Sequence, residues 1–203
     1  MKYIDLTMSI EDAPVYPGDP KCIFERIATF ATDGWNEHKM TFALHIGTHI
    51  DFPLHMIDNG KSQNAYKLND FIGTGKIIDV RGQTDIEAEL YDVEAGDILL
   101  LWTGYSDELD TEKYFDAKSC PKITQKFADE IVKKKLKLVG IDSWSPDVSP
   151  FPIHKTLLGN DILIVENLIN LKELSGKKFK IFVAPLCHNS FDGSPARVFA
   201  EIE

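Results

Sequence analysis

The sequence LHIGTHIDFPLH, residues 44–55, is the stretch around which the rest of the chain can be organised. It holds three of the six histidines of the chain and an aspartate, and these residues share one parity: His45, His49, Asp51 and His55. Apolar side chains take most of the other parity, so an extended chain would present one polar and one apolar face. The spacing of four between the first two histidines also fits zinc ligands on a helix, but the β-branched residues and the proline disfavour a helix. The pattern predicts a strand that runs into a loop.

Gly47 is expected to bend this strand. Fully extended, the α-carbons of His45 and His49 would lie about 13 Å apart at roughly 3.3 Å per residue. That separation is near the limit for two imidazoles that bind one ion at about 2.1 Å each. A glycine between them permits a bend or bulge, and it lets the backbone pass close to whatever the histidines hold. A lone histidine is more often a hydrogen-bonded polar residue than a ligand, but this clustering favours half of a metal site.

Length and composition indicate an ordinary globular protein. The 203 residues suffice for one domain over residues 1–203, and 43% hydrophobic with 27% charged residues is typical of the class. The net charge of −10 argues against sequence-independent nucleic-acid binding, which needs clustered Lys and Arg. Three widely spaced cysteines fit free thiols in a reducing compartment. No membrane-length apolar run and no secretion signal are visible, so we expect a cytoplasmic protein without membrane contact.

Hydrophobic periodicity predicts a mixed α/β domain in which strands outnumber helices. The clearest helix covers residues 124–135, and it leads directly into a strand, which suggests a βαβ unit. Nearly continuous apolar residues over 97–103 indicate a strand buried on both faces. Further strands are expected over 3–7, at a sheet edge, and over 22–30, 38–45, 76–80, 136–141, 161–165, 180–184 and 197–202.

Two residues farther along complete a candidate site. His154 opens a short helix-like segment, and Glu166 ends an apolar strand, where α/β proteins often place functional groups. His45, His49 and Asp51 alone could form a mononuclear site with an open position. With the two later residues there are five ligating side chains, which suit two ions bridged by carboxylates and an exposed bridging water. The remaining histidine, at position 55, would then stay uncoordinated at the rim and be suited to pass a proton.

The pattern His-x-Gly-Thr-His-x-Asp-x-Pro-x-His, followed by His-Lys-x-Leu-Leu and Ile-Val-Glu-Asn-Leu, resembles the cyclase-like metal-dependent hydrolase family. Bacterial kynurenine formamidases and isatin hydrolases are among its members. The resemblance spans nearly the whole chain, from Ile-Asp-Leu-Thr at residues 4–7 to Gly-Ser-Pro-Ala-Arg at residues 193–197. It implies a swivelling β/β/α fold, assembly as homodimers or homotetramers, and two divalent ions per subunit, zinc or manganese.

The resemblance also implies roles for individual residues. His45, His49 and Asp51 would bind the first ion, and His154 would complete the second. Asp51 and Glu166 would bridge the two ions. His55 would be the general acid/base.

One position departs from the pattern of kynurenine formamidases. They carry a tryptophan in the Pro-rich loop, against which the aromatic substrate packs, whereas Tyr16 occupies that position in the loop over residues 13–20. Tyrosine can stack, but it is smaller and brings a hydroxyl that needs a partner. The alternative is that Tyr16 only packs on the prolines of its own loop. Two other loops draw attention: residues 142–147, in which Trp144 could line the pocket, and residues 187–189, expected to be a surface loop with a buried thiol instead of a further ligand pair.

The sequence thus predicts an amidohydrolase in which a metal-bridged hydroxide attacks a small amide, most simply an aryl formamide such as N-formylkynurenine. Hydrolysis of another cyclic amide, imide or lactone, as in isatin hydrolases, is the alternative. A catalytically inactive metal-binding relative is the third hypothesis. It is disfavoured because every expected ligand and the acid/base are present.

Overall fold

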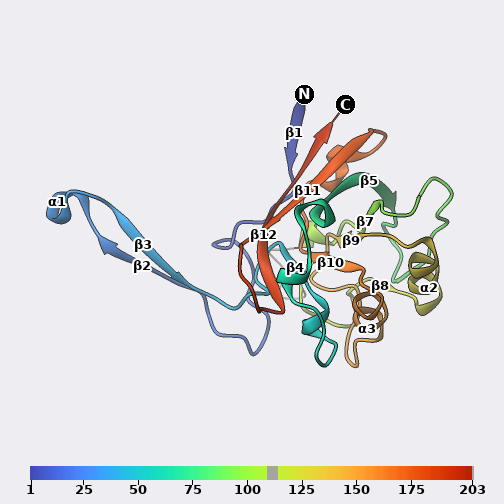
Figure 1. Cartoon of the computed structure of the whole chain (residues 1–203), viewed down its shortest axis with the longest axis horizontal. Coiled ribbons are helices and arrows are strands. Elements are labelled where there is room, and N and C mark those ends of the chain that lie inside the picture. The colour runs from blue at the N-terminus through green and yellow to red at the C-terminus, as the bar shows by residue number, and fades with distance from the viewer. Residues whose placement is uncertain (109–113, 203) are drawn as a thin grey trace.

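A mixed eight-stranded sheet forms the body of the protein in the computed structural model, which describes residues 1–108 and 114–202 (Figure 1). The strand order is β1-β12-β11-β5-β7-β9-β10-β4, and β4 also pairs with β12, so the sheet closes on itself. Strands β5, β7, β9 and β10 are parallel, and the others join antiparallel. Their bounds are β1 (Lys2–Asp5), β4 (His49–Asp51), β5 (Ile72–Asp79), β7 (Ile98–Trp102), β9 (Leu138–Ile141), β10 (Leu163–Glu166), β11 (Phe179–Pro185) and β12 (Gly193–Ile202).

Alternation along the central strands divides the hydrophobic residues into two cores. In β7, Ile98 and Leu100 point into the interior of the closed sheet, while Leu99 and Leu101 face the helices. Two helices cover that outer face, α2 (Gln125–Lys134) and α3 (Pro152–Gly159). The Thr124 hydroxyl caps α2 by accepting from the Phe127 amide. Helix α2 lies in the chain between the parallel neighbours β7 and β9, as the predicted βαβ unit requires.

Short elements complete the body. A two-stranded parallel pair consists of β6 (Asp85–Ile86) and β8 (Lys122–Ile123). In the described part of the chain, 3-10 turns occupy several connections: η1 (Pro53–His55), η2 (Gln63–Ala65), η3 (Leu68–Phe71), η4 (Tyr105–Glu108) and η5 (Leu171–Leu174). No helix in the described ranges is long and apolar enough to cross a membrane.

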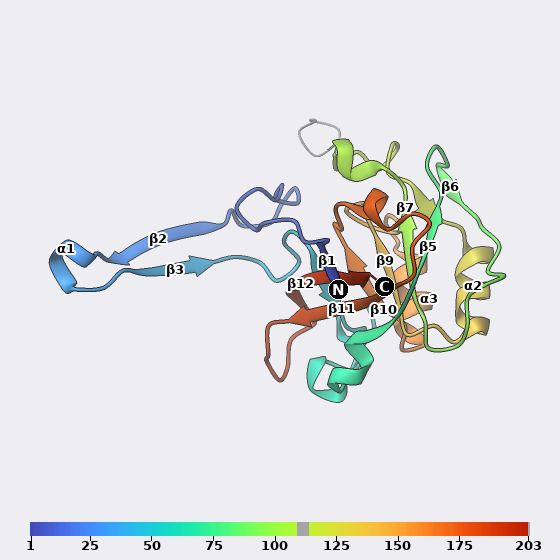
Figure 2. The ribbon, with the colours of Figure 1, turned by 90° about the horizontal axis from the view of Figure 1, so that it is seen from above.

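A hairpin, here called the arm, projects far from the body (Figures 1 and 2). It consists of β2 (Ile23–Ala28), the short helix α1 (Phe30–Asp33) at the tip, and β3 (Glu37–Thr41), so it covers residues 23–41. The two strands pair antiparallel with a bulge near Arg26. Two strands were predicted here, but not their separation from the rest of the fold.

The predicted mixed sheet with few helices is confirmed, with one local error that matters for the site. The strand expected over 38–45 ends at Thr41, and His45 lies in a turn. The reason is Gly47, whose φ of +57° reverses the chain before β4 begins. A Cβ on Gly47 would lie 3.3 Å from the Cβ of Ala13 and 3.4 Å from the carbonyl oxygen of Met8. The predicted bend is thus present, but it approaches the N-terminal segment and not the centre of the site.

Candidate metal centre

Strand β4 carries two of the predicted ligands on the face opposite the interior core. Ile50 and Phe52 are fully buried in that core, whereas His49 and Asp51 alternate with them and face the helix side. The neighbouring strand β10 runs antiparallel to β4 and places Glu166 directly across from His49. The register of β10 against β4 therefore places the Glu166 carboxylate at the site, although Glu166 and His49 lie more than one hundred positions apart in the sequence.

The other three histidines reach the same place from irregular or helical segments. The turn before β4 presents His45, and η1, with Pro53 at its start, presents His55; their ring centroids lie 4.0 Å apart. His154 comes from the first turn of α3. The turn holding His45 needs a glycine beneath it, because a Cβ on Gly193 would fall 2.5 Å from the His45 ring.

The two buried carboxylates each face more than one histidine. Asp51 Oδ1 lies 2.8 Å from His45 Nδ1 and 3.4 Å from His49 Nε2, and its Oδ2 lies 3.6 Å from His154 Nε2. Glu166 Oε2 lies 3.3 Å from His49 Nε2, and its Oε1 lies 3.2 Å from His154 Nε2. All five predicted ligands are thus brought together, with each acid placed between histidines as a bridging carboxylate would be.

The hydrogen bonds made by Nδ1 of His49 and of His154, on the side of each ring away from the carboxylates, indicate whether these residues can bind a metal. His49 Nδ1 donates to the Gly47 carbonyl at 2.9 Å, which leaves Nε2 as the lone-pair nitrogen of the neutral ring. That Nε2 is buried without a hydrogen-bond partner in the described structure, and it faces carboxylate oxygens of Asp51 and Glu166. His154 repeats the arrangement, since Nδ1 donates to Asp147 Oδ1 at 2.6 Å and Nε2 faces Glu166. Lone pairs directed at carboxylates need a cation between them, so the residues fit divalent ions.

The outer partners of the histidines include two acids that the sequence analysis missed. Asp147 orients His154, and Asp192 Oδ2 lies 3.0 Å from His45 Nε2 and 3.4 Å from His55 Nδ1. Such carboxylates fix the ring orientation of metal-binding histidines and raise their basicity. Asp147 ends the loop over residues 142–147, which had been expected near the site. No sequence pattern indicated Asp192, because this residue reaches the site through the pairing of β12 with β4.

The pKa values show how the metal-free site compensates its charges. Burial lowers the pKa of His45, but the charge of Asp51 and the hydrogen bonds to Asp192 and Asp51 outweigh burial and raise it to about 9. Burial likewise opposes protonation of His49, but the facing carboxylates of Asp51 and Glu166 outweigh burial and raise its pKa to about 10. Burial also disfavours the charged form of Asp51, yet the facing histidines hold its pKa well below the usual range. Protons on the histidines therefore supply the positive charge that ions would bring.

His55 differs from the three other histidines of the site. Burial is the largest influence on it and lowers its pKa. It also lies close enough to His45 and Asp51 for the three to share an ion. Geometry alone therefore leaves His55 two roles, proton carrier or ligand, and the predicted role of acid/base remains a prediction.

A buried hydrogen-bond network links the strands that carry the ligands. The Thr48 hydroxyl donates to the Asn167 carbonyl at 2.6 Å and accepts from the Met8 amide at 2.7 Å. The Tyr114 hydroxyl donates to Asn167 Oδ1 at 2.7 Å. Asn167 adopts a φ of +56°, a conformation that asparagine tolerates better than most residues. Because Thr48 precedes His49 and Asn167 follows Glu166, the network fixes the spacing of β4 and β10 at the site.

A pocket of about 330 Å³ opens onto the histidines and Glu166, and aromatic side chains line it. The Tyr16 ring packs 5.4 Å from Phe115 and 5.6 Å from Trp144, measured between centroids. The Pro-rich loop thus contributes an aromatic wall to the site of its own chain, and Trp144 lines the pocket as expected. The other lining residues are Pro14, Asp19, Met56, Ser145 and Phe151.

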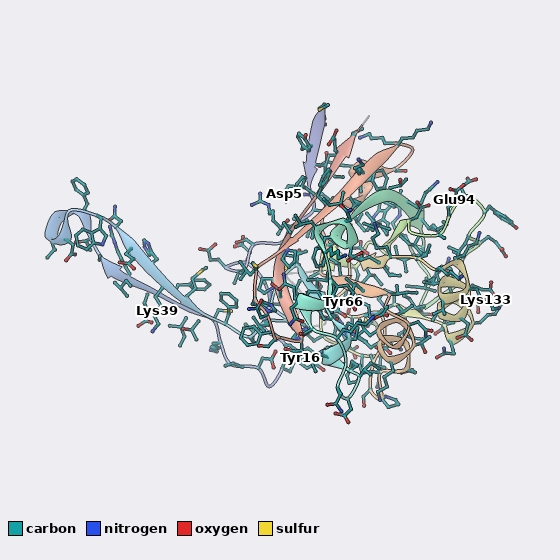
Figure 3. All side chains as sticks on the ribbon, viewed as in Figure 1. Asp5, Tyr16, Lys39, Tyr66, Glu94 and Lys133 are labelled. Atoms are coloured by element: carbon teal, nitrogen blue, oxygen red, sulfur yellow. The ribbon has the colours of Figure 1, made fainter. Side chains whose placement is uncertain are left out.

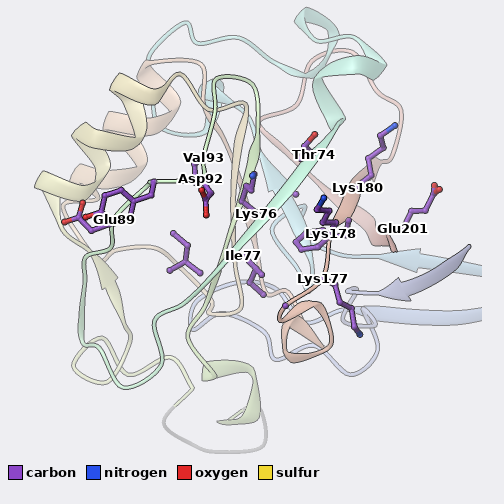
Figure 4. Close-up of a pocket in the computed structure, with 15 residues that line it drawn as sticks. Thr74, Lys76, Ile77, Glu89, Asp92, Val93, Lys177, Lys178, Lys180 and Glu201 are labelled. Carbon is purple, nitrogen blue, oxygen red and sulfur yellow. The ribbon is translucent and has the colours of Figure 1, made fainter. Parts of the chain in front are cut away.

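Two other features lie apart from this site. A larger hollow of about 740 Å³, shown in Figure 4, is lined by lysines and acids of β5, β11 and neighbouring loops and contains none of the predicted site residues.

In the loop over residues 187–189, Cys187 is exposed, so the prediction of a buried thiol is wrong. His188 instead donates from Nε2 to the Gly193 carbonyl at 3.2 Å, and neither residue belongs to the metal-binding groups found among the described residues.

Comparison with known proteins agrees with this geometry. A family model named Cyclase, described as "Putative cyclase", matches residues 4–148. The chain belongs to the Cyclase family. Within it, an uncharacterized protein of Methanocaldococcus jannaschii is 37% identical over 98% of this chain and 99% of the relative. A kynurenine formamidase of Bacillus cytotoxicus is 29% identical over 97% of this chain and 95% of the relative.

Solved structures extend the family likeness to three dimensions. A structure described as a potential metal-dependent hydrolase with cyclase activity has a TM-score of 0.82 and 29% identity, and it covers 98% of this chain and 96% of its own. Isatin hydrolase A from Ralstonia solanacearum has a TM-score of 0.88 at 22% identity, over 100% of this chain and 92% of its own, which speaks for the fold. These neighbours confirm the predicted family and the predicted α/β fold.

Proposed function

We propose that this protein is a metal-dependent amidohydrolase that hydrolyses a small aryl formamide such as N-formylkynurenine. The observation that carries the proposal is the buried set of five ligating side chains at the base of an aromatic pocket. The kynurenine formamidase at 29% identity over nearly the whole chain supports the substrate class.

Two divalent ions are proposed to bind between the facing side chains. His45, His49 and Asp51 would hold one, and His154 with Glu166 the other, with both acids bridging. When bound, such ions lower the pKa of a coordinated water and polarise a carbonyl oxygen. Zinc suits a set of imidazoles and carboxylates, and manganese suits the same carboxylate-rich set.

His55 is the residue that we propose moves the proton. Its Nδ1 lies 3.4 Å from Asp192, so the carboxylate orients the ring and leaves Nε2 for the substrate side. Burial lowers the pKa of His55, so the neutral ring is favoured near neutral pH. His55 would accept a proton as water adds to the carbonyl carbon and return it to the nitrogen as the C–N bond breaks.

The aromatic wall would position the substrate. Its cavity of about 330 Å³ is at the small end of ligand pockets. Tyr16 and Trp144 offer ring faces to an aryl group, while the buried end of the pocket holds the charged groups that would face the formyl carbonyl. The wall thereby orients the reacting bond toward the ions and His55.

Tyr16 is also the observation that favours a second candidate, hydrolysis of a cyclic amide, imide or lactone. A tyrosine in place of the tryptophan of kynurenine formamidases gives the pocket a smaller ring and a hydroxyl. The same ligands and the same proton carrier would open a ring as readily as they would remove a formyl group. The two candidates differ only in what the pocket accepts.

Metal content and turnover together test the proposal. The protein is purified without added metal, its metals are counted, and hydrolysis of N-formylkynurenine, simple aryl formamides and a cyclic imide is followed before and after chelation. Turnover of a formamide that chelation abolishes and metal restores is the expected result. Metal with ring-opening activity alone would select the second candidate. A protein that binds no divalent ion even after reconstitution would refute the metal-dependent reaction altogether.

A further inference from the structure

The hollow of about 740 Å³ in Figure 4 gathers positive charge in an acidic protein. The whole chain has 32 acidic against 22 basic residues, whereas four lysines and three acids line this hollow. The lysines are Lys76, Lys177, Lys178 and Lys180, and the acids are Glu89, Asp92 and Glu201. Strand β5 provides the first lysine, and the segment that enters β11 provides the others. The fold therefore brings together lysines from two segments that lie far apart in the sequence.

Strand register places three of these lysines close together. Lys180 of β11 pairs with Thr74 of β5, and the same antiparallel register, continued to the residue before β11, sets Lys178 across from Lys76. Side chains directly opposite each other have Cβ atoms about 4.5–5.5 Å apart, diagonal neighbours lie about 7–8 Å apart, and like charges so placed repel. Alternation puts all three on the face of β5 that carries Ile78, which packs against the helix-side core. These three lysines are here called the lysine group.

The lysine group has no counter-charge of its own. Lys39 on the arm and Lys133 on α2, both labelled in Figure 3, each form an ion pair with a glutamate. Within the described ranges, the lysine group forms no ion pair and no side-chain hydrogen bond, so none of the three acids that line the hollow neutralises it. Lys76 is also partly buried. A partly buried ammonium without a counter-charge is unfavourable, and an anion in the hollow would relieve both this cost and the repulsion.

A second part of the hollow is apolar and aromatic. The loop between β6 and β7 contributes Tyr91 and Val93, and β5 contributes Ile78. The Tyr91 side chain is 84% exposed. An exposed tyrosine offers a ring face on which a planar ring can stack. The hollow thus combines a site for negative charge with a site for a flat apolar group.

We propose that this hollow binds a nucleoside di- or triphosphate. Its phosphates would lie against the lysine group and the Thr74 hydroxyl, because ammonium and hydroxyl groups donate hydrogen bonds and phosphates supply several charged acceptor oxygens. The base would lie on Tyr91. A volume of about 740 Å³ is within the usual range for small-molecule sites.

The charge of the whole protein favours a small ligand over a nucleic acid. A net charge of −10 repels a long polyanion, whose backbone would extend beyond the hollow over acidic surface. A nucleotide fits inside, where lysines outnumber acids. The hollow shares no lining residue with the pocket at the metal centre, so this binding is independent of the hydrolysis proposed above.

Calorimetric titration of the metal-free protein, in buffer without divalent ions, tests the proposal. The ligands are adenosine triphosphate, inorganic triphosphate and sulfate. The unmodified chain is compared with Lys76→Gln/Lys178→Gln and with the control Lys67→Gln/Lys118→Gln, which removes two exposed lysines outside the hollow. We expect adenosine triphosphate to bind more tightly than the other two ligands. Its affinity should fall about tenfold for each lysine removed from the lysine group, as for hydrogen bonds to charged groups, and stay unchanged in the control.

Two further variants separate the parts of the proposed site. Tyr91→Ala should weaken binding of adenosine triphosphate and leave inorganic triphosphate unaffected, because only the nucleotide has a ring to stack. Lys76→Arg/Lys178→Arg keeps both charges and should retain most of the affinity, which guards against misfolding as the cause of a loss. Absence of binding, or binding that survives Lys76→Gln/Lys178→Gln, would overturn the proposal. Equal affinities for adenosine triphosphate, inorganic triphosphate and sulfate would overturn the assignment to a nucleotide.

Discussion

The metal centre buries polar and charged side chains, whereas the arm exposes apolar ones. At the centre, His49, Asp51 and Glu166 are at most 5% exposed, although they are polar or charged. On the arm, Phe30 and Trp35 are more than half exposed, although they are apolar. Each arrangement is unfavourable for the isolated chain, since buried charges need counter-charges and exposed apolar surface needs cover. Each region is therefore incomplete in the isolated chain: the centre needs positive charge between its buried carboxylates, and the arm needs a surface that covers its apolar side chains.

The largest effect should follow from removing the charge shared at the centre. Asp51→Asn keeps the shape of the side chain but removes the carboxylate that faces His45, His49 and His154. We expect loss of bound metal and loss of turnover together, because no other side chain among the described residues reaches all three histidines as closely. Metal analysis and a hydrolysis assay measure both. Full metal content in this variant would mean that Asp51 is not a bridging ligand.

His55→Ala should separate binding from chemistry. If His55 only carries the proton, metal content stays at the level of the unmodified protein and turnover falls by about 10²–10⁴-fold, the usual contribution of a general acid or base. If metal is lost as well, His55 is a ligand, as its closeness to His45 and Asp51 also permits. Either result decides whether His55 is a proton carrier or a ligand.

The outer carboxylates should matter less than the ligands. Asp147→Asn and Asp192→Asn each weaken the hold on a histidine ring without removing a ligand. We expect a 10–100-fold loss of metal affinity, as is typical for such partners. Competition with a coloured chelator measures the loss, and Asp79→Asn, whose carboxylate pairs with exposed Arg81, is a matched control. An effect as large in the control would show that the loss reflects overall charge.

Metal affinity should also depend on pH beyond the usual range of histidine. The pKa values of His45 and His49, about 9 and about 10 in the metal-free protein, lie above the ordinary 6.5. Both rings are therefore protonated at pH 7, and an ion must displace those protons. Apparent affinity should keep rising from pH 7 toward pH 9 and fall steeply in acid. Calorimetry in buffers of different ionisation heat counts the released protons; an affinity that is flat above pH 7 would contradict the protonated site.

The smallest effect on the fold itself is expected at the arm. Phe30→Ser should change the stability of the isolated subunit by no more than about 0.5 kcal/mol, as surface substitutions commonly do. The measurement is chemical unfolding of the variant and of the unmodified chain at one equal, low concentration. A large loss there would show that the arm packs on its own body and would remove the contrast with the metal centre.

Local sequence patterns were sufficient where function resides in neighbouring residues. The alternation of residues 49–52 correctly separated the two faces of β4, and Gly47 correctly indicated a bend. The position of His45 was mispredicted as strand because alternation cannot show where a glycine turns the chain. Asp192 was missed for another reason, since its role depends on β12 returning beside β4, a pairing between residues far apart in the sequence.

The sequence by itself determined the donor types, the spacing of the first four polar residues, and the likeness to the Cyclase family, because these are properties of neighbouring residues. Tertiary structure alone decided which nitrogen of each histidine faces the carboxylates, since the Gly47 carbonyl and Asp147 select the tautomers of His49 and His154. It also decided that the aromatic wall lies over the metal centre and that the arm stands free. Those outcomes depend on sheet closure and on packing between distant segments, which no local pattern encodes.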